Sequence, residues 1–97
     1  MSPIDHGLTL QYDHELQKVE DCLKMHHESG WANILQVWRS ELKQVSDLAV
    51  LKRHAARTSR SLGGMESLGE AAMMINDPEL LRLIEDLFPS CKLILTS

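Results

Sequence analysis

The sequence has few aromatic residues and no long hydrophobic run. Its only aromatic side chains, apart from histidine, are Trp31, Trp38, Tyr12 and Phe88. The core must therefore be built mainly from aliphatic side chains and methionine, a mixture that favours helices over sheets. No segment approaches the ~20 consecutive apolar residues that a membrane helix needs, and residues 1–7 lack the basic flank and apolar run of a signal peptide. We therefore expect a cytoplasmic protein with no membrane partner.

Cysteine is also scarce, since the chain contains only Cys22 and Cys91. Two cysteines do not make a disulfide framework, and we expect both thiols to stay reduced. Cys22 and His26 share a helix face at a spacing of four, so they could supply two of the four ligands of a structural zinc site. Cys91, His14 or His6 could complete such a site, but no spacing in the sequence requires it. The sequence therefore favours ordinary surface histidines, and we predict no metal and no cofactor.

The motifs of common enzyme sites are missing. Gly63 and Gly64 are not followed by the Lys-Ser/Thr pair of a phosphate-binding loop, and no predicted strand precedes them. Cys22 lies one position from the apolar stripe of a predicted helix, where nothing resembles the activated thiol of a hydrolase. Neighbouring carboxylates such as Glu85 and Asp86 belong to polar helix faces, where solvation explains them. We therefore predict that the protein is not an enzyme and has no catalytic residues.

Apolar side chains recur at helical spacing in five segments. The pattern predicts long helices over residues 8–28, 31–45, 48–61 and 78–88, and a short one over residues 68–75. Whether the second and third helices are separate or form one bent rod is left open. In the first helix, the face opposite the apolar stripe is predicted to be solvated. It carries Asp13, Lys18, Glu20, Asp21 and Lys24.

Capping residues mark the boundaries between these helices. Ser29 and Gly30 are predicted to end the first helix, because glycine tolerates the left-handed conformation that is common there. Ser46 and Asp47 predict a break and an N-cap, because either side chain can accept a bond from a free backbone N–H. Ser67 and Glu70 have the spacing of a capping box, in which each side chain bonds to the backbone N–H of the other residue.

The last helix has the clearest start signal in the sequence. Asp77 can cap it, and Pro78 suits its first position. Pro89 is predicted to stop it, which leaves residues 90–97, like residues 1–7, as flexible or extended ends. The architecture that follows is a single all-α domain over residues 1–97, an antiparallel bundle of four to five helices with short connections.

The charges are distributed in three blocks, although the net charge is only −4. Residues 1–30 carry six acids and two bases, residues 31–62 carry two acids and six bases, and residues 63–97 again carry six acids and two bases. Blocks of opposite sign often neutralise one another inside a bundle. Alternatively, an acidic face stays exposed and steers a basic partner towards the protein.

The basic residues of segment 48–60 raise the alternative of a helix-turn-helix protein that binds DNA. Arg53, Arg57 and Arg60 are of the type that contacts base edges from a recognition helix. However, the flanking segments are acidic, and no second basic element is present to hold the DNA backbone. Nucleic acid is therefore a disfavoured partner.

The most distinctive segment is the loop at residues 63–68, with the sequence GGMESL. Mechanically, its glycines allow a tight reversal, Met65 and Leu68 fill the core, and Ser67 caps the next helix. With the helix that contains Trp31 before it, this order resembles a family of small helical bacterial proteins with a Gly-Gly-Met-x-Ser-Leu loop. Such proteins often lie beside toxin genes of antibacterial systems, which identifies them as candidate immunity proteins.

The resemblance spans about residues 30–75, with two departures inside the motif. Glu66 stands where the family usually has glycine, and Gly69 and Glu70 stand where Asn-Asp is common. The motif is structural within the family, so it carries no binding residues over to this chain.

The resemblance implies an immunity protein that binds the catalytic domain of a cognate toxin and occludes its active site. Many such toxins are basic around their sites, so acidic side chains are the predicted partner-binding residues. They are Asp13, Glu20 and Asp21 on the first helix, with Glu66 and Glu70 near the loop. The alternative function is a self-associating helical adaptor or regulator without catalytic activity, and the sequence is compatible with a homodimer.

Overall fold

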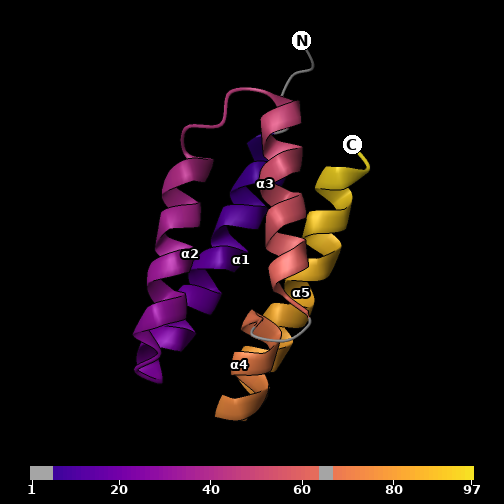
Figure 1. Cartoon of the computed structure of the whole chain (residues 1–97). Coiled ribbons are helices and arrows are strands. Elements are labelled where there is room, and N and C mark those ends of the chain that lie inside the picture. Colours follow the sequence, from indigo (N-terminus) through magenta and orange to yellow (C-terminus); the bar gives the residue numbers. More distant parts are fainter. Residues whose placement is uncertain (1–5, 64–66) are drawn as a thin grey trace.

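Five α-helices make up the part of the chain that the computed structural model describes, residues 6–63 and 67–97, and this part contains no strand. In chain order they are α1 His6–Met25, α2 Ser29–Leu42, α3 Leu48–Ser61, α4 Leu68–Ile75 and α5 Pro78–Leu95. The all-α prediction is confirmed, and α2 and α3 are separate helices. The start of α1 and the end of α5 lie at the same end of the bundle (Figure 1).

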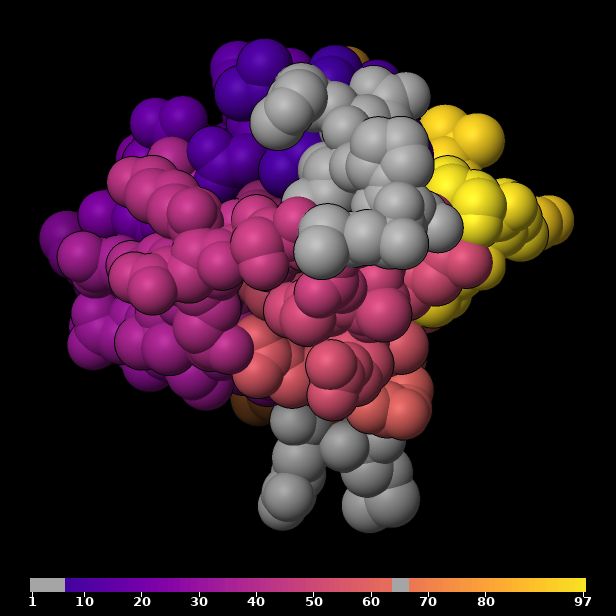
Figure 2. All heavy atoms as spheres, turned by 90° about the horizontal axis from the view of Figure 1, so that it is seen from above, coloured from indigo at the N-terminus to yellow at the C-terminus, as the bar shows by residue number. Residues whose placement is uncertain are grey.

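The four long helices form a bundle that is closed on three sides. α1 packs against α2 and α5, and α3 packs against α5, whereas α2 and α3 touch each other at few places. Seen from above, α1, α5, α3 and α2 follow one another around the bundle (Figure 2). The short α4 packs against α5 at the lower end (Figure 1). The molecule is elongated, with extents of 42 × 21 × 20 Å.

The core is aliphatic, as the shortage of aromatic residues predicts. Every long helix contributes fully buried leucines, among them Leu16, Leu35, Leu51 and Leu87. Tyr12 is the largest fully buried side chain. Among the described residues, no helix is both long and apolar enough to cross a membrane.

Three predicted N-caps are present. The Asp47 carboxylate accepts a hydrogen bond of 3.0 Å from the N–H of Val50 at the start of α3. The Ser67 hydroxyl accepts a bond of 3.1 Å from the N–H of Glu70, which is one half of the predicted capping box. Asp77 caps α5, and Pro78 occupies its first position. Each cap satisfies one of the backbone donors that a helix start leaves without a partner.

The prediction that Ser29 and Gly30 end the first helix was wrong. α1 ends at Met25, and the left-handed residue is His27, with φ 59°. The N–H of Glu28 donates a hydrogen bond of 2.9 Å to the Leu23 carbonyl, and the N–H of His27 donates one of 3.0 Å to the Lys24 carbonyl. This pair of bonds is the Schellman pattern, which closes the end of a helix without glycine. Gly30 instead lies in the first turn of α2.

The prediction that Pro89 ends the last helix, with residues 90–97 flexible or extended, was also wrong. α5 continues through Pro89 to Leu95. Its buried stripe runs on past the proline, with Cys91 and Ile94 at most 1% exposed. Burial of this stripe outweighs the backbone hydrogen bond that a proline removes from a helix.

Candidate functional site

A groove runs along the open side of the bundle, between α2 and α3. It encloses about 970 Å³. Its apolar lining comes from both sides, with Val37 and Val45 contributed by α2 and the residues just after it, and Val50 and Ala56 by α3. The groove exists because α2 and α3 both pack on the rest of the bundle but diverge from each other.

Three arginines line the α3 side of this groove. Arg53, Arg57 and Arg60 are spaced by four and three residues, so they share one helix face. α3 carries four bases and no acid, while the whole chain has a net charge of −4. Among the described residues that line the groove, Glu41 is the one acid. The positive charge of the protein is therefore concentrated on this side of the bundle.

Arg57 is fixed in the groove by two contacts from α2. Its guanidinium carbon lies 5.4 Å from the ring centroid of Trp38, a cation–π distance. Its Nη1 donates a hydrogen bond of 3.1 Å to Glu41. The other two nitrogens, Nε and Nη2, are buried and have no hydrogen-bond partner among the described residues. Two side chains of α2, Trp38 and Glu41, thus hold Arg57 in place.

A hydrogen-bonded network beneath the groove joins three helices. His54 Nδ1 lies 2.8 Å from the Tyr12 hydroxyl, which lies 2.7 Å from the Thr58 hydroxyl. His54 Nε2 lies 2.8 Å from the backbone carbonyl of Trp38. Because a carbonyl can only accept, Nε2 carries the hydrogen. The network ties α1 and α2 to α3 and fixes the wall that presents the arginines.

Burial shifts the pKa values of two side chains in this network, His54 and Tyr12. Burial lowers the pKa of His54, and the nearby Arg57 lowers it further, whereas the bond to the Trp38 carbonyl opposes the shift. Burial also raises the pKa of Tyr12. Near neutral pH, both side chains are therefore uncharged.

We expect acid to weaken the fold through His54. Because its pKa in the folded state lies below the ordinary value of 6.5, the unfolded chain takes up the proton first as the pH falls. The free energy of unfolding should therefore decrease from about pH 6.5 towards the lowered pKa, by at most ~1.4 kcal/mol per pH unit. Urea unfolding measured across this range, for the wild type and for His54→Gln, checks this. A variant with the same pH dependence as the wild type would contradict it.

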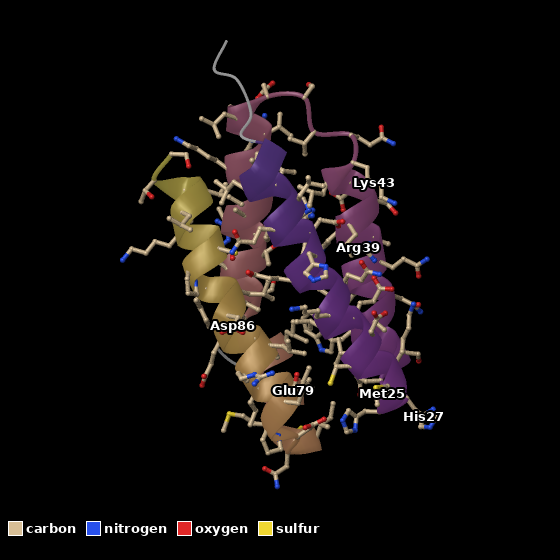
Figure 3. The ribbon with its side chains drawn as sticks, turned by 180° about the vertical axis from the view of Figure 1, so that it is seen from behind. Met25, His27, Arg39, Lys43, Glu79 and Asp86 are labelled. Atoms are coloured by element: carbon tan, nitrogen blue, oxygen red, sulfur yellow. The ribbon has the colours of Figure 1, made fainter. Side chains whose placement is uncertain are left out.

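The predicted acidic surface on the first helix is partly used inside the fold. Arg39 of α2 reaches α1 (Figure 3) and bonds to Asp13 at 2.9 Å and to Glu20 at 3.3 Å. Lys24 also bonds to Glu20, at 2.7 Å. The Glu20 side chain is only 5% exposed, so the prediction that it lies on the solvated face was wrong. The cause is Arg39, which comes from the neighbouring helix and covers the carboxylate.

The other predicted partner-binding residues are scattered over different elements. Asp21 is exposed on α1, and Glu70 is exposed on α4. Glu66 lies outside the described residues, as do Gly64 and Met65 of the same loop. That these acids bind a partner stays a prediction.

A second cluster of reactive side chains joins the end of α1 to the start of α5. Cys22 Sγ lies 3.7 Å from Asp77 Oδ2, and His26 Nε2 lies 2.6 Å from the same oxygen. Burial raises the pKa of the Cys22 thiol, and the Asp77 carboxylate raises it further. The hydrogen bond from His26 lowers the pKa of Asp77. The pairing of Cys22 with His26 is visible in the sequence, but Asp77 is far along the chain and could not be found there.

Comparison with known proteins assigns no family to the chain. No protein-family model, no curated protein and no solved structure matches it. What is established is a small all-helical bundle with an arginine-lined groove on its open side.

Proposed function

We propose that this chain is a non-enzymatic binding protein, and that the groove between α2 and α3 takes up an acidic, amphipathic helix of a partner protein. The observation that supports this most directly is the combination of an aliphatic lining with a row of arginines in one groove. Helices bound in grooves present an apolar stripe to such a lining. Carboxylates beside that stripe would meet the arginines.

The arginines are suited to a partner rather than to internal pairing. Arg53 and Arg60 are exposed, and no hydrogen bond or ion pair to another described residue engages either side chain. Arg57 is already held by Trp38 and Glu41, and its side chain is still 40% exposed, so it loses little side-chain entropy when a carboxylate approaches. Fixed guanidinium groups recognise carboxylates with two parallel hydrogen bonds.

The finer form of the proposal is that the partner is a bacterial toxin, which the chain neutralises as an immunity protein. The resemblance of residues 63–68 to immunity proteins supports this. The bound segment would belong to the toxin's catalytic domain, and the bulk of the bundle would then cover the active site. Asp21 and Glu70 would be secondary contacts. Asp13 and Glu20 would first have to give up their bonds to Arg39.

Nucleic acid fits the groove less well than a protein helix does. A nucleic acid has no apolar stripe for the valines that line the groove, and the sequence has no second basic element to hold its backbone. Self-association remains the alternative, with α3 of one copy meeting an acidic face of another. Size-exclusion chromatography of the chain alone over a range of concentrations distinguishes the two. Self-association predicts a dimer that forms as the concentration rises, whereas a groove for a different protein predicts a monomer throughout.

Co-expression tests the proposed function. We expect the product of the neighbouring gene to be lethal when expressed alone in a bacterial host and harmless when expressed with this chain. The two proteins should co-purify as a one-to-one complex on a tag carried by this chain. A neighbour that is harmless alone and does not bind would remove the immunity function and leave the self-associating adaptor.

A further inference from the structure

We propose that Cys22, His26 and Asp77 form a zinc-binding site that joins the end of α1 to the start of α5. Their ligand atoms all lie within 4.8 Å of one another, and one residue supplies each of sulfur, nitrogen and oxygen. This donor set suits Zn²⁺, which binds thiolate, imidazole and carboxylate. The site lies away from the groove, since none of its residues lines the groove.

The distances from Asp77 Oδ2 to the other two donors are within about 1 Å of what a tetrahedral ion requires. Bonds of ~2.0–2.3 Å place neighbouring ligand atoms about 3.3–3.6 Å apart. The distance of 3.7 Å between Cys22 Sγ and Asp77 Oδ2 already fits. The distance of 2.6 Å between His26 Nε2 and the same oxygen must widen by about 0.7 Å, because zinc would replace the hydrogen between these atoms. His26 is exposed, so its ring can make this movement.

The end of α1 positions Cys22 and His26, and the start of α5 positions Asp77. Cys22 and His26 are one helical turn apart, and Leu23 between them is fully buried, which anchors this part of the chain. Asp77 uses Oδ1 to accept a hydrogen bond of 2.9 Å from the N–H of Glu79, so its other oxygen points at Cys22 and His26. Such outer hydrogen bonds hold a ligating carboxylate in place.

The surroundings supply no fourth protein ligand among the described residues, so the fourth position is left to solvent. Cys91, which the sequence offered as a fourth ligand, is buried near Glu15 and Tyr12 instead. The side chain of His6 lies outside the described residues. Figure 3 shows Met25 and His27 at the end of α1, at the same end of the molecule as Glu79 of α5. The ion would therefore lie at this end of the bundle and link α1 to α5.

Cobalt titration of the reduced full-length protein tests the site. One equivalent of Co²⁺ should produce the charge-transfer absorption of a thiolate–cobalt bond, and Zn²⁺ should abolish it. Cys22→Ser should remove this absorption, whereas the matched control Cys91→Ser should keep it. Because Cys22 is buried and its replacement could disturb folding, two further variants are needed. His26→Gln and Asp77→Asn should each weaken cobalt binding by about tenfold or more.

The Asp77→Asn variant is informative because asparagine can still accept the bond from the N–H of Glu79 and cap α5. Its helix content should therefore match the wild type while its metal affinity falls. The proposal is overturned if excess Co²⁺ gives no charge-transfer absorption with the wild type. It is equally overturned if Cys91→Ser, rather than Cys22→Ser, removes the absorption.

Discussion

Gly69→Ala should destabilise the protein by about 2 kcal/mol or more, although alanine normally stabilises a helix. A Cβ atom on Gly69 would lie far inside van der Waals contact with the backbone carbonyl oxygen of Leu62. The first turn of α4 packs directly against the end of α3 at this point, and a backbone atom cannot move aside as a flexible side chain can. For a domain of this size, the midpoint of thermal unfolding should fall by about 10 °C.

Gly63→Ala is the matched control for this prediction. The same substitution is made six residues earlier, but no atom of the described part of the chain lies within 4 Å of the added Cβ, and Gly63 does not have a left-handed backbone. Its free energy of unfolding should stay within about 0.5 kcal/mol of the wild type. Thermal unfolding followed by circular dichroism measures both variants. If Gly69→Ala were as stable as Gly63→Ala, the packing of α4 against Leu62 would be wrong.

Pro89→Ala should stabilise the protein by about 2 kcal/mol. A proline inside a helix costs about 3 kcal/mol relative to alanine, because it removes a backbone hydrogen bond and crowds the preceding turn. Pro89 is exposed, so its replacement removes nothing from the core. The unfolded alanine variant has more conformational freedom, and this offsets the gain in the free energy of unfolding by up to about 1 kcal/mol.

The control for this prediction is Pro78→Ala. Pro78 stands at the first position of α5, where the missing N–H has no partner in the helix and proline is well tolerated. Urea unfolding should therefore show a clear gain for Pro89→Ala and little change for Pro78→Ala. A Pro89→Ala variant that is no more stable than the wild type would mean that α5 does not run on to Leu95.

The helices could be predicted from the sequence because each long helix has an apolar stripe of its own. The caps at Asp47, Ser67 and Asp77 are local in sequence and were found for the same reason. The continuation of α5 past Pro89 could not be found this way. It depends on burial of the last helical turns against the rest of the bundle, and this burial outweighs a local signal.

The site residues were harder to predict because they depend on which helices meet. Glu20 has the spacing of a solvated side chain, but Arg39 from α2 covers it. Arg53, Arg57 and Arg60 were recognised as a basic face, but nothing in their spacing says that α2 stands apart from α3 and leaves a groove beside them. Helical periodicity predicts which face of each helix is apolar. It does not predict how far apart two helices stand, and the groove depends on that separation.

The most direct test of the binding function compares charge reversals inside and outside the groove. Arg53→Glu/Arg60→Glu reverses two exposed groove charges, and Lys18→Glu/Lys92→Glu makes the same change of charge at exposed positions outside the groove. The measurement is the affinity of each purified variant for the product of the neighbouring gene, by calorimetric titration. We predict that the groove variant binds at least about tenfold more weakly than the wild type, and that the control binds within about threefold of it. Equal affinities for the two variants would contradict a partner bound between α2 and α3.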